Sequence, residues 1–286
     1  MIKQLTIIGV GLIGGSLARA LKRAGVVGEV VGAGRDVQHL QQALALGVVD
    51  RIETDLALAV QGADIVVVAT PVGAAEAVFR SIAPGLSADT ILTDVGSTKA
   101  SVVAAARAAF GQLPENFVPG HPIAGAEKSG VEASFAELFK GRRIILTPTK
   151  NSAPQAVTRV RTMWEKVGAN VVETGVEHHD EVLAATSHLP HLLAFSLVDT
   201  LAKLDTKQEV FEYAAGGFRD FTRIASSDPE IWHDICLHNS PALLQILARF
   251  EADLDKLRQA IADSDSEYLL QVFTQAKAAR DQFCEG

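Results

Sequence analysis

The sequence of 286 residues predicts an α/β fold, in which a doubly wound sheet domain is followed by an all-α domain. Short apolar runs alternate with helical segments in the first part of the chain, whereas the last part shows helical periodicity alone. Of the 23 glycines, 20 lie in residues 1–175, and alternating strands and helices need more turns than a helical bundle does. We therefore expect two domains, residues 1–175 and residues 176–286.

The first part is expected to alternate strands and helices. Strands are predicted at residues 4–9, 29–33, 64–70, 90–95, 142–147 and 170–174, and helices at 14–23, 37–46, 99–110 and 154–167. The run 64–70 is continuous and rich in β-branched residues, which is typical of a strand buried on both faces of a parallel sheet. The repeated strand–helix–strand order predicts a doubly wound sheet that these strands extend together.

The second part is expected to consist of helices at 182–204, 241–263 and 264–283, with Pro190 kinking the first of them. Leucines recur along one face of the second helix, at Leu243, Leu247 and Leu254. Helices this long and apolar exceed what one small bundle can bury. We therefore expect a homodimer formed through the C-terminal helices.

The composition excludes several classes of protein. The chain is 48% hydrophobic and 21% charged with a net charge of −8, which suits a globular protein and argues against nucleic-acid binding and a polybasic membrane patch. No uninterrupted apolar run approaches the roughly 18 residues of a spanning helix. Cys236 and Cys284 make neither a disulfide framework nor a metal motif, so we expect a cytoplasmic protein.

A glycine motif follows the first predicted strand. Gly9, Gly11 and Gly14 form G-x-G-x-x-G, in which the first glycine permits a tight turn, the second lets a pyrophosphate approach and the third allows close helix packing. The amides of the helix that begins here, including those of Leu12 and Ile13, would meet the phosphates. The alternative is a glycine-rich turn without a ligand. The context predicts a Rossmann-type dinucleotide-binding domain.

The expected acidic residue on the cofactor ribose is missing. Twenty residues after Gly14 stands Gly34, followed by Arg35, whereas a carboxylate usually holds the ribose of NAD at this place. Arg35 can bind a 2′-phosphate and Gly34 leaves room for it. Asp36 is the competing candidate, but its position suits the N-cap of the next helix. We expect NADP rather than NAD.

Thr70, which ends the run 64–70, and Pro71 directly after it are further expected contacts of the cofactor.

Two segments carry the candidate catalytic residues. Ser97 follows the strand at 90–95, and His121 lies between Gly120 and Pro122 in a predicted loop. A neutral imidazole can take a proton from a substrate hydroxyl near pH 7, so His121 is a candidate general base. The alternatives are a histidine that only braces its loop and a serine that only caps the helix at 99–110.

Five motifs together resemble those of prephenate and arogenate (cyclohexadienyl) dehydrogenases. They are the glycine motif, DVGSTK at 94–99, GHPIAG at 120–125, SHLPH at 187–191 and GFRDFTR at 217–223, and they occur in the order seen in that family. The resemblance covers nearly the whole chain. It implies oxidative decarboxylation of prephenate or arogenate in tyrosine biosynthesis, with His121 accepting the proton of the ring C4 hydroxyl and Ser97 hydrogen-bonded near that hydroxyl.

The resemblance also implies that the second domain binds the substrate. It points to His188 and His191 in the pocket, to Arg223 on the ring carboxylate and to Trp232 as an aromatic wall. From the residues alone the histidine pair could instead be structural or bind a metal, although no third ligand is obvious. Arg219 and Arg223 could likewise form ion pairs within a helix, and Trp232 could be ordinary core.

Two other functions share some of these features. β-Hydroxyacid dehydrogenases have the same two-part layout but usually employ a helix lysine, where this chain has His121. A nonenzymatic NADP-sensing protein would need no clustered histidines and arginines.

Overall fold

The computed structural model describes residues 1–126 and 128–285, and the side chains of residues 283–285, including that of Cys284, lie outside the described part. The described chain divides into two compact units, one covering Met1–Ser240 and the other beginning at Pro241. The first unit contains all the described strands and the helices up to residue 238. The boundary near residue 175, where strands give way to helices, remains a prediction.

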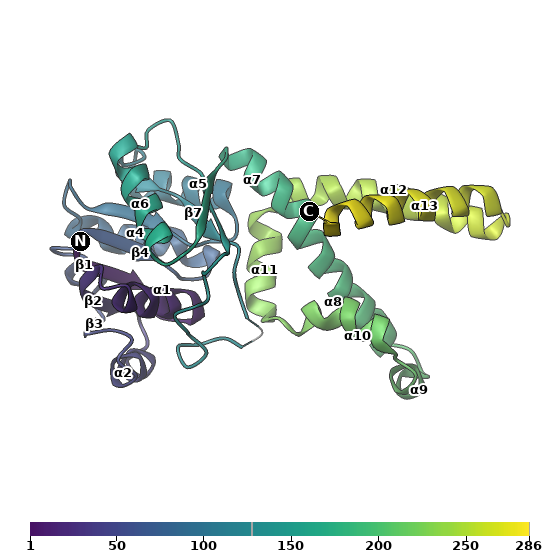
Figure 1. The fold of residues 1–286 in the computed structure, drawn as a ribbon, viewed down its shortest axis with the longest axis horizontal. Helices are drawn as coiled ribbons and strands as arrows, with labels where there is room; N and C mark the ends of the chain where they lie inside the picture. Colours follow the sequence, from purple (N-terminus) through teal and green to yellow (C-terminus); the bar gives the residue numbers. More distant parts are fainter. Residues whose placement is uncertain (127, 286) are drawn as a thin grey trace. The chain divides into compact units, whose positions relative to one another are not determined.

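A six-stranded parallel sheet forms the centre of the first unit (Figure 1). Its strands are β1 (Ile2–Ile8), β2 (Val27–Ala33), β3 (Arg51–Glu53), β4 (Ile65–Val68), β5 (Ile91–Asp94) and β6 (Phe117–Val118). They lie in the order β3-β2-β1-β4-β5-β6, so the chain reverses direction across the sheet between β1 and β4. This order confirms the predicted doubly wound fold, and ligands of such sheets bind at the reversal point, beyond the carboxyl ends of the strands.

Helices cover both faces of this sheet. They are α1 (Leu12–Arg23), α2 (Val37–Ala45), α3 (Leu56–Ala59), α4 (Ala75–Ile82), α5 (Lys99–Phe110) and α6 (Pro154–Lys166). Alternate residues of β4 enter two separate cores, because Ile65 and Val67 pack with α1 and α6, whereas Val66 and Val68 pack with α4 and α5. The β-branched run is therefore buried on both faces, as predicted.

A second, smaller sheet carries His121. It consists of β7 (Gly120–Pro122), β8 (Arg143–Leu146) and β9 (Asn170–Glu173), with β7 antiparallel to β8 and β9 parallel to it. The prediction that residues 142–147 and 170–174 extend the doubly wound sheet was wrong, because an alternating pattern fixes a strand but not its partner. His121 pairs with Ile145 and so lies in a strand, not in the predicted loop.

After β9, the regular secondary structure of the described chain is helical. It contains α7 (Val176–Leu183), α8 (Leu189–Ala202), α9 (Lys207–Glu212), α10 (Gly216–Thr222), α11 (Pro229–His238), α12 (Ser240–Ala262) and α13 (Ser266–Glu285). In Figure 1, α12 and α13 run in opposite directions, in green-yellow and yellow. The sequence did not predict the short helices α9, α10 and α11.

The predicted helix at 182–204 is interrupted by a π-helical turn, Ala184–His188. The amide of Leu189 bonds to the carbonyl of Ala184, and Pro190 stands in the first turn of α8. Proline has no amide hydrogen and its ring displaces the carbonyl four residues back, so the turn before it widens. The wide turn ends at His188, which is buried.

The continuous stretch Val176–Ala202 is long and apolar enough, by length and composition alone, to cross a membrane. That is weak evidence, because core helices pass the same test. Here its first half carries the buried polar residues His179, Asp180 and His188. These residues are part of the site described next.

Candidate active site

The glycine motif forms a cradle at the carboxyl end of β1. Gly9 has a φ of +92°, and a Cβ atom there would lie 2.6 Å from the carbonyl oxygen of Ala69. A Cβ atom on Gly14 would lie 2.4 Å from the Gly9 carbonyl oxygen, whereas one on Gly11 would meet nothing within 4 Å. Gly9 and Gly14 therefore serve close packing, and Gly11 leaves the open space that a pyrophosphate needs.

Polar groups face the same end of the sheet. The helix α1 begins at Leu12 with Gly11 as its N-cap, so no side chain caps the first amides, those of Leu12 and Ile13. The hydroxyl of Thr70, just after β4, is buried without a hydrogen-bond partner among the described residues, and Pro71 beside it is exposed. Unsatisfied donors of this kind fit a dinucleotide bound across β1 and β4.

The residues after β2 leave space where a ribose would lie. A Cβ atom on Gly34 would meet only Leu40, at 3.9 Å. Arg35 is exposed and forms no hydrogen bond or ion pair within the described part of the chain. Asp36 is the N-cap of α2 and accepts the amide of His39 at 3.1 Å, as predicted.

A buried ion pair fixes the backbone before His121. The ammonium of Lys99 donates to Asp94 and, at 2.6 Å, to the carbonyl of Gly120. Asp94 in turn accepts the amides of Gly96 at 2.7 Å and Gly120 at 3.1 Å. Burial lowers the pKa of Lys99, and the Asp94 carboxylate opposes that shift. Both backbone groups of Gly120 are thus held, so β7 is tied to the end of β5.

A row of hydrogen bonds leads from His121 to the start of α5. His121 Nδ1 lies 2.9 Å from His179 Nε2, and His179 Nδ1 lies 2.8 Å from Asp180 Oδ1. Asp180 accepts the amide of Lys99 on Oδ1 and that of Ala100 on Oδ2, each at 2.8 Å. Strand β7, helix α7 and helix α5 therefore meet at this point.

The surroundings keep His121 uncharged. Burial, followed by the nearby groups His179, Lys99 and His188, lowers the pKa of His121 well below 6.5. Burial would raise the pKa of Asp180, but the hydrogen bonds from His179 and from the two amides of α5 lower it overall. A neutral imidazole is therefore linked through His179 to an anchored carboxylate, and a neutral imidazole can act as a general base.

The prediction that Ser97 could cap the helix was wrong. The N-cap of α5 is Thr98, whose side chain makes no capping bond, because Asp180 accepts the first two amides instead. Ser97 is half-buried and makes no hydrogen bond to another described residue. Its hydroxyl is therefore available to a ligand.

The π-helical turn places His188 beside the same network. The side-chain amide of Asn239 lies 2.9 Å from the carbonyl of Asp180 and 3.0 Å from Nδ1 of His188. Burial lowers the pKa of His188 to about 4. His188 is therefore neutral near pH 7. In the described part of the chain, no three His, Cys, Asp or Glu side chains are grouped to hold a metal ion.

His191 and Trp232 form a stacked wall. Their ring centroids are 3.6 Å apart at an interplanar angle of 16°. The ring centroids of His188 and Trp232 are 6.2 Å apart, with the two rings at 75°. His191 Nδ1 lies 2.8 Å from the Ser187 carbonyl. Burial lowers the pKa of His191 despite that bond, and the positive charge of Arg223 lowers it further. Trp232 is half-buried, so it is not enclosed core.

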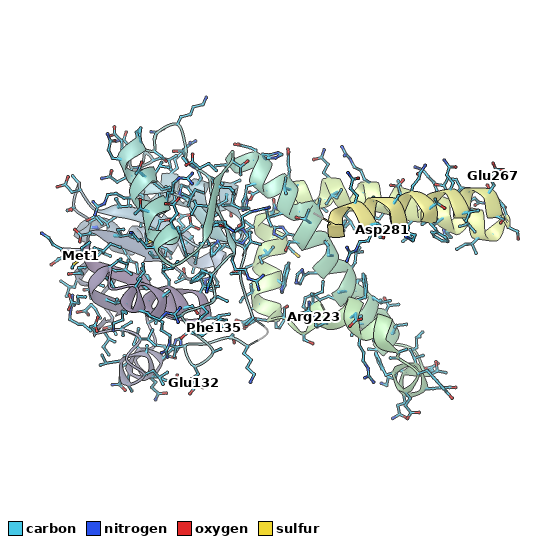
Figure 2. The ribbon with its side chains drawn as sticks, in the orientation of Figure 1. Met1, Glu132, Phe135, Arg223, Glu267 and Asp281 are labelled. Carbon is cyan, nitrogen blue, oxygen red and sulfur yellow. The ribbon has the colours of Figure 1, made fainter. Side chains whose placement is uncertain are left out.

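Arg223, labelled in Figure 2, follows α10 in a short 3-10 turn, Arg223–Ser226. Arg219 belongs to α10 itself, so the two arginines are not carried by one continuous α-helix. Both are exposed. His188, His191, Trp232 and Arg223 therefore come together, and Asn239 links them to the row that ends at His121.

Sequence reasoning missed the residues that hold this site. Asp94, Lys99, Asp180 and Asn239 are all buried, and His179 is 1% exposed. A usable signal was the adjacent pair His179–Asp180, because a histidine beside an acid commonly marks an oriented imidazole. Asn239 stands at a helix end, where an asparagine gives no functional signal.

Two family models match the chain. Residues 17–173 match the nucleotide-binding domain of prephenate dehydrogenase, and residues 175–275 match the dimerization domain of prephenate dehydrogenase.

Individual relatives agree. The cyclohexadienyl dehydrogenase of Zymomonas mobilis is 42% identical over 97% of this chain and 95% of its own length. The prephenate dehydrogenase of Bacillus subtilis is 38% identical over 97% of this chain and 75% of its own. The crystal structure of Aquifex aeolicus prephenate dehydrogenase with hydroxyphenyl propionate and NAD⁺ has a TM-score of 0.91 at 37% identity, covering 99% of both chains. The chain therefore belongs to the prephenate dehydrogenase family of NAD(P)-dependent oxidoreductases.

Proposed function

We propose that this protein oxidatively decarboxylates prephenate, arogenate or both, with His121 as the general base. The observation that carries the proposal is a buried, neutral imidazole, hydrogen-bonded at Nδ1, on the strand that is tied to the carboxyl end of β5. The names of the Zymomonas mobilis and Bacillus subtilis relatives support the substrate class.

His121 takes the proton of the ring C4 hydroxyl, which makes departure of a hydride from C4 easier. A bound nicotinamide would supply the hydride acceptor. Loss of the ring carboxylate as CO₂ then makes the ring aromatic. His121 then returns its proton to the phenolate oxygen, so the base is neutral again after each turnover. The hydroxyl of Ser97 hydrogen-bonds to the same substrate oxygen. A positioned base of this kind contributes about 10²–10⁴-fold in rate.

The dinucleotide would be held by the cradle of Gly9, Gly11 and Gly14, by the amides of Leu12 and Ile13, and by Thr70 and Pro71. We propose NADP as the favoured cofactor, because Arg35 is exposed beside the open space at Gly34 and no carboxylate stands there. NAD is the alternative, and the Aquifex aeolicus relative has been crystallised with NAD⁺.

The substrate would lie against the wall of His191 and Trp232. We assign the ring carboxylate to Arg223, because a guanidinium binds a carboxylate through two parallel hydrogen bonds. His188 is neutral and can donate from Nε2, because its Nδ1 accepts the side-chain amide of Asn239. His191 is neutral and can accept at Nε2, because its Nδ1 donates to the Ser187 carbonyl.

The C-terminal helices would form a homodimer. Large apolar side chains are exposed along them, at Leu244, Leu254, Ile261, Leu270 and Phe273. Exposed apolar side chains of this number on two helices fit an interface between two copies. Light scattering that gives the mass of a monomer would refute this part. A cytoplasmic location is proposed with it, on the sequence evidence alone.

A two-by-two kinetic assay tests the activity. Purified protein is supplied with prephenate or arogenate and with NAD⁺ or NADP⁺, and reduced cofactor is followed together with CO₂. We expect stoichiometric formation of both with at least one substrate. Absence of turnover in all four combinations would contradict the proposal and favour a nonenzymatic NADP-binding protein.

A further inference from the structure

The hydrogen bonds around Asp180 have a fixed direction. Both carboxylate oxygens accept backbone amides of α5, at 2.8 Å each. The pKa of Asp180 is lowered despite its burial, so the carboxyl group is ionised. An ionised carboxylate only accepts hydrogen bonds. His179 must therefore donate through Nδ1, 2.8 Å from Oδ1.

With one proton on each ring, this direction determines which nitrogen carries it. A neutral His179 with its proton on Nδ1 has a lone pair on Nε2, so it accepts from Nδ1 of His121 at 2.9 Å. A neutral His121 with its proton on Nδ1 has its lone pair on Nε2. The nitrogen left to accept a substrate proton is thus Nε2.

We infer that His179 and Asp180 are positioning residues, which hold His121 in the tautomer whose Nε2 is the base. The inference rests on the proposed function, since it concerns the same proton transfer. Without the row of bonds the neutral ring would exchange between two tautomers, of which only one can accept the proton at Nε2. After the transfer, Nδ1 of His121 still donates to His179, and the Asp180 carboxylate lies one ring away from the new positive charge.

Asp180 also links the base to the second catalytic segment. Its carboxylate binds the first two amides of α5, the helix that begins two residues after Ser97. A negative charge is stabilised at a helix N-terminus. One carboxylate therefore orients the ring of His121 through His179 and anchors the helix that follows Ser97.

Long-range ¹⁵N–¹H correlation spectra of the full-length protein give the tautomer directly. Each signal is assigned by its disappearance from the spectrum of a variant in which one histidine is replaced. We expect the wild type to show His121 protonated on Nδ1 and unprotonated on Nε2. A proton on Nε2 of His121 would overturn the inference, whatever the enzyme turns over.

Two substitutions at His179 distinguish an effect on the tautomer of His121 from an effect on packing. His179→Gln keeps an acceptor, because the glutamine amide oxygen reaches about as far as Nε2, whereas His179→Leu fills the space without one. We expect His179→Leu to lower kcat by about 10²-fold or more, with KM changed less than threefold, and His179→Gln to retain most of the activity. The exposed neighbour His178 provides the matched control, because His178→Leu should leave both constants unchanged.

Asp180→Asn tests the far end of the row. In the serine-protease triad the same exchange lowers kcat by about 10⁴-fold, because the histidine adopts the wrong tautomer. We expect a large loss of kcat here with a mixed His121 tautomer in the spectrum.

Wild-type kcat in the His179→Leu variant, with Nδ1 of His121 still protonated, would refute the inference while the proposed activity stands. If instead the wild type reduces neither cofactor, the proposed function fails, and the spectrum still decides the tautomer.

Discussion

The buried ion pair between Lys99 and Asp94 offers a quantitative test of how the site is held. The two side chains are 0% and 3% exposed. Lys99→Met removes the ammonium but keeps a long apolar side chain, so the Asp94 carboxylate stays buried without its cation. Removing one partner of a buried ion pair costs about 3–5 kcal/mol in the free energy of unfolding.

Two features of the site bound this loss. The amides of Gly96 and Gly120 can still donate to Asp94, so we expect about 3 kcal/mol, the lower end of that range. A carboxyl group can also take up a proton. For an aspartate with the usual aqueous pKa of about 3.9, that uptake costs about 4 kcal/mol at pH 7 and about 1.5 kcal/mol at pH 5. The loss in Lys99→Met should therefore shrink as the pH falls from 7 to 5.

Urea unfolding followed by far-UV circular dichroism at both pH values measures the loss. Lys22→Met is the matched control, because Lys22 pairs with Asp50 at 2.6 Å with 29% and 40% of the two side chains exposed, and such pairs contribute about 0.2–1 kcal/mol. The double variant Asp94→Asn, Lys99→Met should recover most of the stability, since no charge is left unpaired. A loss at Lys99 no larger than at Lys22, or one independent of pH, would refute the reasoning.

Four further predictions concern the site. His121→Asn should lower kcat by about 10²–10⁴-fold with the cofactor Kd unchanged, and wild-type turnover would remove His121 as the base. Wild-type kcat/KM should stay level as the pH falls through 6.5, because the lowered pKa of His121 keeps the base unprotonated there; an acid limb centred at or above 6.5 would contradict this. Arg35→Ala should raise the Kd of NADP by about tenfold or more, as measured by fluorescence titration, and leave that of NAD unchanged; equal weakening of both would end the argument for a 2′-phosphate contact. Arg223→Ala should raise KM for the substrate by about tenfold or more, since a charge-assisted pair is lost, and an unchanged KM would place Arg223 outside the pocket.

The sequence predicted those parts of the fold that have a period or a motif. The β-branched run of β4, the glycine motif and the capped start of α2 are local patterns, and the structure has each of them. The three-residue strand β7 has no readable period, so His121 was expected in a loop. The helix interruption at 184–188 depends on Pro190 acting on the turn before it, where a simple kink was expected.

The sequence predicted the residues expected to contact the ligand, but not the buried residues that hold them in place. His121 and Arg223 carry chemistry that a motif exposes. Asp94, Lys99 and Asn239 matter because of partners distant in the sequence, such as the bond from Asn239 to the carbonyl of Asp180, 59 residues away. Only the fold brings such pairs together, so a contact between residues distant in the sequence cannot be predicted from one sequence alone.

The neutral histidines of the pocket have a consequence for the end of the catalytic cycle. His188 and His191 meet the ligand as dipoles, so in the proposed complex the charge of Arg223 faces the ring carboxylate. The reaction removes that carboxylate as CO₂, so the product lacks the group that Arg223 binds in the proposed complex. A pocket lined with several cations would retain the remaining acid. Here the loss of the carboxylate weakens binding of the product relative to the substrate, and this favours release of the product.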